Sequence, residues 1–129
     1  MRSNVCHSSG ACNAQIQHTG GQWQSAEYWT FSISDEAGKY RLSVSGYSGD
    51  AGDAMTGLSP ATRNADGMMF STPDQDNDLN PEFNRAAYYN GCGWWFGGYS
   101  RSRLNYDNTA MWMTANADVQ FSRMLVRAN

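Results

Sequence analysis

Two neighbouring segments that alternate large apolar with polar residues constrain the fold of this chain most strongly. The first covers residues 27–34, Glu-Tyr-Trp-Thr-Phe-Ser-Ile-Ser, and the second covers residues 40–45, Tyr-Arg-Leu-Ser-Val-Ser. A period of two is typical of half-buried β-strands, because successive side chains point to opposite faces of a sheet. Residues 35–39 between them contain turn-forming Asp and Gly. The two segments therefore predict an antiparallel β-hairpin.

The rest of the chain is rich in turns and poor in charge. Only 16% of the 129 residues are charged, against about 25% in typical globular domains, which disfavours a helical bundle with charged faces. Gly-Asp and Asp-Gly pairs punctuate residues 46–81. We expect a short helix near Asp53 and a closing strand over residues 118–127. The sequence thus predicts an α+β fold: a short twisted antiparallel sheet with few short helices and long ordered loops.

The first 21 residues show no clear period and are predicted to form an N-terminal arm or loop. Three cysteines are present. Cys6 and Cys12 are close enough in sequence to close a small loop, whereas Cys92 has no obvious partner. One disulfide and one unpaired thiol would indicate an oxidising compartment. Three buried thiols in a reduced protein are the alternative.

Charge and motif content argue against several classes of function. The net charge is −3 and no Lys/Arg run is present, so we expect no nucleic-acid partner. No apolar run approaches the roughly 20 residues that span a bilayer, so we expect no membrane partner. The GxSxG, HExxH and P-loop patterns of common enzymes are also missing from the sequence, and we expect no enzymatic activity. Asp50 and Asp53 could form a catalytic carboxylate pair, but turn and cap roles are favoured.

An acidic segment, Asp-Gln-Asp-Asn-Asp, is a candidate for metal binding. Its aspartates are Asp74, Asp76 and Asp78. Hard cations such as Ca²⁺ take several oxygen ligands, and carboxylates also compensate their charge. The segment is not an EF-hand, because the sixth position is Leu79 rather than Gly and the twelfth is Arg85 rather than Glu. A solvated acidic turn is the alternative interpretation.

Several motifs, taken together in their order and spacing, resemble the fibrinogen C-terminal (fibrinogen-related) family from about Gln22 to the C-terminus. They are KYRL at 39–42, YSGDAGDAM at 47–55, FSTPDQDND at 70–78, WWF at 94–96, SRLN at 102–105, Trp112 and MLVR at 124–127. The resemblance covers roughly the second half of the family's domain, so residues 22–129 would be a shortened fibrinogen-related domain. Residues 1–21 have no counterpart in it. The resemblance implies a secreted, extracellular recognition domain.

The resemblance also implies a ligand set for calcium. In this family the ion is held by the side chains of the second and third Asp of the acidic run and by two main-chain carbonyls that follow it. The corresponding groups here are the side chains of Asp76 and Asp78 and the carbonyl oxygens of Asn80 and Glu82. Such an all-oxygen set, completed by water, suits Ca²⁺. Asp74 would support the turn.

A ligand pocket is implied next to the calcium loop. Lectin members of the family bind acetylated sugars, or other acetylated groups, in an aromatic pocket there. The corresponding positions are Tyr89, Gly98, Tyr99, Ser100 and Tyr106. An acetyl methyl would pack on tyrosine rings, and its carbonyl would accept a backbone N–H near Tyr99. We interpret Trp94 and Trp95 as core residues, because such bulky aromatic residues are more often buried.

The chain departs from the family pattern around this pocket. The family has a disulfide whose cysteines flank the Trp-Trp motif, and those places hold Arg85 or Ala86 and Tyr99 here. The second cysteine normally follows a cis peptide bond, equivalent to Gly98–Tyr99. A non-proline cis bond costs about 2.5–4 kcal/mol, so without the disulfide we do not expect it to form.

Two hypotheses about function follow from these observations. The first is a calcium-binding, lectin-like module for acetylated glycans, active in innate recognition or agglutination. The second is a structural or assembly domain that has lost the sugar pocket and binds protein partners, as a homo-oligomer or as part of a larger assembly. The acidic loop and Tyr89 favour the first, and the missing disulfide favours the second.

Overall fold

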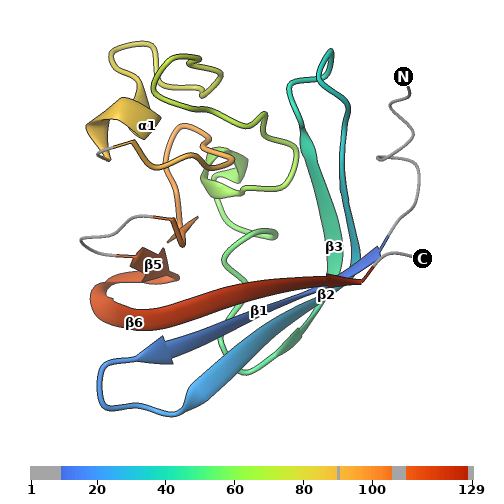
Figure 1. Cartoon of the computed structure of the whole chain (residues 1–129), viewed down its shortest axis with the longest axis vertical. Coiled ribbons are helices and arrows are strands. Elements are labelled where there is room, and N and C mark those ends of the chain that lie inside the picture. Colours follow the sequence, from blue (N-terminus) through green and yellow to red (C-terminus); the bar gives the residue numbers. More distant parts are fainter. Residues whose placement is uncertain (1–9, 90, 106–109, 128–129) are drawn as a thin grey trace.

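The computed structural model describes residues 10–89, 91–105 and 110–127. Six strands form one antiparallel sheet in the order β3-β2-β1-β6-β5-β4 (Figure 1). The strands are β1 Gly10–His18, β2 Trp23–Ile33, β3 Leu42–Gly49, β4 Ser102–Arg103, β5 Ala110–Trp112 and β6 Thr114–Arg127. The helices are a 3-10 turn over Ala61–Arg63 and α1 over Arg85–Tyr88. The predicted α+β fold, with short helices and long ordered loops, is confirmed.

The strands β2 and β3 form the hairpin that the two alternating segments predict. Their antiparallel register pairs Ile33 with Leu42 and Tyr28 with Tyr47. Tyr28 and Leu42 are each only 1% exposed. The hairpin therefore turns one apolar face towards the interior, as the period of two requires.

The N-terminal segment contributes a central strand of the sheet rather than an arm. β1 lies between β2 and β6, and its residues Cys12, Ala14 and Ile16 are at most 2% exposed. The prediction of an arm or loop over residues 1–21 is therefore wrong for residues 10–18. Buried and exposed residues do alternate there. The alternation was hard to recognise because the buried Cys and Ala have a small apolar surface, and the Asn and Gln between them have weak β-propensity.

The C-terminal strand β6 confirms the predicted closing strand and begins earlier, at Thr114. It runs antiparallel to β1, so that Ala11 pairs with Arg127 and Asn13 pairs with Leu125. The first and last described strands are thus neighbours in the middle of the sheet.

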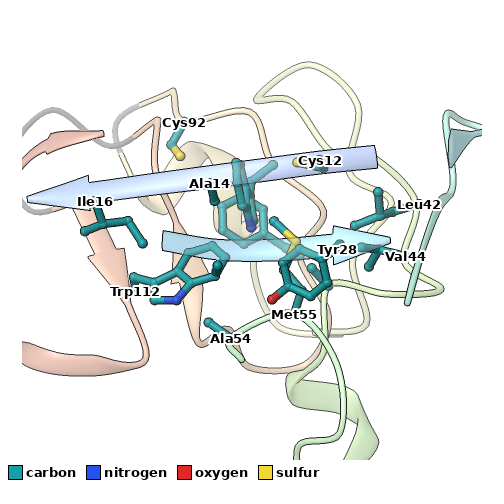
Figure 2. Packing of buried hydrophobic residues seen from close by; sticks show 14 of the residues in the cluster. Cys12, Ala14, Ile16, Tyr28, Leu42, Val44, Ala54, Met55, Cys92 and Trp112 are labelled. Carbon is teal, nitrogen blue, oxygen red and sulfur yellow. The ribbon is translucent and has the colours of Figure 1, made fainter. Parts of the chain in front are cut away.

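A layer of loops covers one face of the sheet. Residues 50–89 and 91–101, from the segment between β3 and β4, occupy this layer, drawn from green to orange in Figure 1. Figure 2 shows their Met55 gathered with Tyr28 and with Trp112 of β5. The Nε1–H of Trp112 donates to the Gly52 carbonyl at 2.8 Å. Trp94, also from the layer, is 1% exposed, which confirms its role in the core.

The segment near Asp53 forms a turn, so the prediction of a helix there is wrong. Its Oδ1 accepts hydrogen bonds from the Met55 N–H at 3.1 Å and the Thr56 N–H at 2.9 Å. The Tyr28 hydroxyl donates to the same oxygen at 2.8 Å. A short Asx-type turn satisfies these backbone donors locally, which competes with helix formation. The expected turn role of Asp53 is confirmed.

The thiols of Cys12 and Cys92 are buried and reduced, and no disulfide is present among the described residues. The expected bridge between Cys6 and Cys12 is therefore wrong, because the Cys12 side chain lies in the core. Cys6 itself lies outside the described residues. Burial raises the pKa of the Cys12 thiol to about 11, so this thiol stays protonated and unreactive at neutral pH.

We predict that Tyr28→Phe lowers the free energy of unfolding by about 1–2 kcal/mol, because it removes a hydrogen bond to a carboxylate. Tyr88→Phe is the matched control, since Tyr88 is 65% exposed, and it should change stability by less than about 0.5 kcal/mol. Urea denaturation of both variants measures the difference. Equal effects would contradict the structural role of the bond between Tyr28 and Asp53.

Candidate functional site

The acidic segment lies in a loop that is attached to the segment preceding it, next to the core. We call residues 74–82 the acidic loop. The Asn77 N–H donates to Ser71 Oγ at 3.0 Å, and the Asn77 side-chain amide donates to the Phe70 carbonyl at 2.9 Å. Ser71 is fully buried and pairs with Trp94 in an isolated β-bridge. One asparagine inside the acidic run therefore fixes the loop to the core.

Side chains at alternate positions of the loop each accept a hydrogen bond from the backbone N–H two residues further on. Asp76 Oδ1 accepts from the Asp78 N–H at 3.2 Å, and Asp78 Oδ1 accepts from the Asn80 N–H at 2.8 Å. Asn80 Oδ1 continues the series by accepting from the Glu82 N–H at 2.7 Å. This repeated turn motif explains why alternate positions carry Asp and Asn. It also directs the side chains of Asp76 and Asp78 to neighbouring positions.

Asp78 connects the acidic loop to α1. Its Oδ2 accepts from the backbone N–H of Arg85, the first residue of α1, at 2.9 Å. Burial is the main cause that raises the pKa of Asp78, and the negative charge of Asp76 raises it further. The backbone N–H groups of Arg85 and Asn80 act in the opposite direction. The ionised pair therefore carries an unfavourable electrostatic energy that a bound cation would relieve.

Two main-chain oxygens are available as further donors at the candidate metal site. Among the hydrogen bonds of the described residues, none uses the carbonyl oxygen of Asn80 or of Glu82. The part of the chain that is described contains no group of three or more His, Cys, Asp and Glu side chains arranged for a metal. A site here consequently needs these carbonyls beside the two carboxylates. This donor set is compatible with Ca²⁺ and unsuited to a soft metal.

Asp74 takes part in the turn. Its Oδ1 accepts a hydrogen bond of 2.6 Å from the Thr72 hydroxyl, and this bond lowers the pKa of Asp74. The carboxylate thus has a partner within its own turn.

Two of the predicted ligand residues, Gly98 and Tyr99, are hydrogen-bonded to the 3-10 turn. The Gly98 N–H donates to the Thr62 carbonyl at 3.0 Å, and the Tyr99 N–H donates to the same oxygen at 3.3 Å. The Gly98–Tyr99 peptide bond is trans. The Ser100 hydroxyl donates to the Ser102 carbonyl. The predicted residue Tyr106 lies outside the described residues.

Tyr89 follows α1 and is half-buried against other side chains. Phe96 stacks on it with a centroid distance of 5.8 Å, and the guanidinium carbon of Arg103 lies 4.2 Å from its ring centroid. Tyr88 meets it edge-on at 5.1 Å. An aromatic wall at this position is therefore supported on several sides by the protein itself.

A group of exposed aromatic side chains lies next to the acidic loop, and only one of them, Tyr99, was predicted from the sequence as a ligand residue. We call Phe83, Tyr88 and Tyr99 the aromatic rim; they are 39%, 65% and 62% exposed. The Phe83 and Tyr88 rings lie 5.0 Å apart. Arg85, only 7% exposed, places its guanidinium carbon 5.4 Å from the ring centroids of both Phe83 and Tyr99. No local pattern in the sequence signals this group, because Tyr99 is distant from Arg85 in the sequence and meets it only in the folded chain.

The structure of α1 explains how these side chains are presented. Asn84 caps the helix, and its Oδ1 accepts from the Ala86 N–H at 2.8 Å and the Ala87 N–H at 3.2 Å. Its side-chain amide donates to the Thr72 carbonyl at 3.1 Å. The cap thus joins the helix to the loop that precedes the acidic run. In Figure 1 this helix lies on the side of the loop layer that is remote from β1.

Comparisons with known proteins identify the fold and its family. The family model of the C-terminal globular domain of fibrinogen beta and gamma chains matches residues 6–124. Human fibroleukin is 42% identical over 80 residues, which are 62% of this chain and 18% of fibroleukin. A techylectin-like protein from Phoneutria nigriventer is 40% identical over 80 residues, covering 62% of this chain and 32% of that protein.

Solved structures agree with this result. The fibrinogen-like globe domain of human ANGPTL2 superposes with a TM-score of 0.79 at 26% identity, covering 94% of this chain and 59% of that one. Lamprey fibrin D-dimer, solved with the peptide ligand Gly-His-Arg-Pro-amide, gives a TM-score of 0.78 at 25% identity, covering 92% of this chain and 45% of that one.

The chain therefore spans less than a third of the length of these two curated relatives and about half of the solved chains. Among the described residues, no helix is both long enough and apolar enough to cross a bilayer. The motifs, the sheet with its covering loops and the match over residues 6–124 lead to one conclusion. This chain belongs to the family of fibrinogen C-terminal globular domains, in a shortened form.

Proposed function

We propose that this chain is an extracellular, calcium-stabilised recognition domain that binds acetylated glycans beside its acidic loop. The observation that carries the proposal is the pairing of Asp76 with Asp78, followed in the acidic loop by two carbonyl oxygens that take part in no hydrogen bond among the described residues. The proposed ligands are the side chains of these aspartates and the carbonyls of Asn80 and Glu82. We propose binding rather than catalysis as the activity.

The chemistry of the four groups favours calcium among the common cations. All are hard oxygen donors, which disfavours a thiolate- or imidazole-seeking metal. Two main-chain carbonyls in a turn give a flexible, irregular geometry, and Ca²⁺ tolerates this better than Mg²⁺ does. The ion would supply charge compensation to the carboxylate pair. With only two carboxylates in the set, we expect a dissociation constant of about 0.1–1 mM, as in other extracellular calcium modules.

Asp78 would transmit the effect of the ion to the ligand surface. One of its oxygens accepts from the Arg85 N–H at the start of α1, and Tyr88 ends that helix. Holding Asp78 in place therefore holds the helix that presents part of the aromatic rim. Calcium acts in this proposal as a brace for the surface and does not contact the sugar.

An acetyl group can find both of its complementary partners here. Its methyl would pack on the exposed ring of Tyr99, and its carbonyl would accept the Tyr99 N–H. That N–H is engaged with Thr62 at 3.3 Å, which is a long and weak hydrogen bond. The shorter 3.0 Å bond from Gly98 keeps the Thr62 carbonyl satisfied when Tyr99 exchanges partner. The techylectin-like relative supports a lectin-type function.

A protein-binding or assembly module is the second candidate, with a homo-oligomer or a larger complex as its setting. Tyr89 favours it, because Phe96 and Arg103 already pack against its ring. The lamprey fibrin structure was solved with a peptide ligand, which supports the same interpretation.

Calcium should raise the melting temperature of the wild-type protein by mass action. At a concentration of about 100 times the dissociation constant the gain is about 2.7 kcal/mol. The double variant Asp76→Asn/Asp78→Asn keeps an acceptor oxygen at each position but removes both charges, and it should lose the calcium-dependent gain. Asp74→Asn in the same loop is the matched control and should keep it. Differential scanning calorimetry measures the melting temperatures with and without calcium. An equal calcium-dependent rise in all three proteins would contradict the assignment of Asp76 and Asp78 as calcium ligands.

Calcium affinity should fall on acidification from a higher pH than an ordinary Asp would require. The pKa of Asp78 is raised in the folded protein. At a pH between the unfolded and the folded pKa, Asp78 is therefore protonated in the calcium-free folded protein and ionised in the unfolded chain. Without calcium, stability should therefore fall as pH rises from the unfolded pKa to the folded one, and calcium should offset this loss. Melting curves between pH 3 and 7, with calcium and with a chelator, measure both trends. A calcium gain that does not depend on pH in this range would contradict them.

N-acetylglucosamine should shift the amide resonances of Tyr89 and Tyr99 when calcium is present, and glucose should not. Only the acetylated sugar offers the methyl group and carbonyl that the site would recognise. A single small site binds weakly, so millimolar sugar is required. Heteronuclear NMR of labelled protein provides the measurement. If the shifts appear only in residues remote from 89–99, the protein-binding module is the better account.

A further inference from the structure

Arg85 is a buried cation without a protein counter-ion among the described residues. The residue is 7% exposed. Its Nε is fully shielded and has no hydrogen-bond partner. Within the described chain, no carboxylate, carbonyl or hydroxyl oxygen contacts any nitrogen of the guanidinium. Burying a charged group in this way is costly unless another group compensates it.

The terminal nitrogens of Arg85 keep some access to solvent. They form no hydrogen bond with the described residues. Of the side-chain nitrogens of Arg85, only Nε is both shielded from solvent and unbonded, so each terminal nitrogen keeps some exposed surface. The side chain thus runs under the surface and presents the end of its donor fork outwards. Aromatic rings lie around this end, with the centroids of Phe83 and Tyr99 each 5.4 Å from the guanidinium carbon.

The rings compensate the charge only in part. A cation–π contact stabilises the positive charge, but it provides no acceptor for the planar N–H groups. An arginine held in one orientation by two rings has also lost most of its side-chain freedom before a ligand arrives. A ligand that accepts two hydrogen bonds from this fork would therefore bind to a preorganised donor.

We propose that Arg85 binds the carboxylate of an acidic sugar, whose ring lies against the aromatic rim. This inference rests on the proposed glycan recognition and names a second, charged group of the ligand, which the acetyl contact at Tyr99 does not require. The guanidinium fork matches the two oxygens of a carboxylate in bidentate geometry. The exposed rings of Phe83, Tyr88 and Tyr99 offer apolar surface to the C–H face of a pyranose ring.

The charge of the surroundings selects a singly charged anion. The whole chain carries a net charge of −3, and Asp76, Asp78 and Glu82 of the acidic loop precede Arg85 closely. A sulfated or phosphorylated polyanion would need a cluster of cations and would be repelled here. One carboxylate needs one cation, and Arg85 provides it.

The same charges couple the anion to calcium. The Asp78 carboxylate lies against the backbone of Arg85, with Oδ2 at 2.9 Å from its nitrogen. Without a metal ion, the acidic loop repels an incoming carboxylate. A calcium ion on Asp76 and Asp78 would cancel this repulsion, so the acidic sugar should bind more tightly with calcium than without it.

The test compares glucuronate with glucose, which differ in the carboxylate. Isothermal titration or NMR titration of the wild type, with calcium, should show glucuronate binding at least about tenfold more tightly, as one charge-assisted bidentate pair allows. Arg85→Met, which keeps the length of the side chain, should abolish this preference. Arg123→Met is the matched control, because Arg123 also lies over an aromatic ring, 5.0 Å from the Trp23 centroid, but it is a residue of β6 and remote from the rim. It should keep the preference.

A measurement on the wild type protects the test against misfolding of the Arg85→Met variant. The Nε–H resonance of Arg85 should shift with glucuronate and stay unchanged with glucose. Equal affinity for the two sugars, or a preference that survives in Arg85→Met, would overturn the proposal. The proposal would also be overturned if an acidic tripeptide shifted the Arg85 Nε–H resonance and glucuronate did not, because that result would indicate a protein ligand. N-acetylglucosamine is titrated in parallel: if it binds while glucuronate does not, this inference fails and the proposed glycan recognition stands.

Discussion

The structure depends on the constraint that a long layer of loops, rather than helices, must cover the apolar face of the sheet. Irregular backbone packed on a core still has to satisfy its N–H and C=O groups. Polar side chains satisfy many of them here. Asp53 bonds two backbone N–H groups of its turn, and Asn77 holds the acidic loop to Ser71 and Phe70. The low charge and the many Asp, Asn and Ser residues of the chain follow from this requirement.

The candidate site is a consequence of the same constraint. The aspartates that could hold a cation are also the residues that close the turns of the acidic loop. Asp78 uses one oxygen within the loop and the other at the start of α1. Metal binding and local folding therefore use the same carboxylate, which is why the loop and the aromatic rim are joined so directly.

Sequence patterns predicted those parts of the fold in which one short segment carries its own signal. The hairpin and the closing strand are of this kind, and the family motifs identified the fold as a whole. β1 was missed because its buried residues are small and give a weak apolar pattern. Ala14, for example, faces the core with no exposed surface, because larger residues cover it. The arrangement at Arg85 could not be predicted, since Phe83 and Tyr99 approach it only after the chain has folded.

The pairing of β1 with β6 determines how the domain responds to tension. Ala11, at the beginning of the first described strand, lies opposite Arg127, at the end of the last one. A force that separates these two points acts across the strands and loads their hydrogen bonds one after another, as in opening a zip. Strands pulled along their length would instead resist with many bonds together. A domain pulled at these two points would therefore yield at the centre of its sheet, where β1 separates from β6.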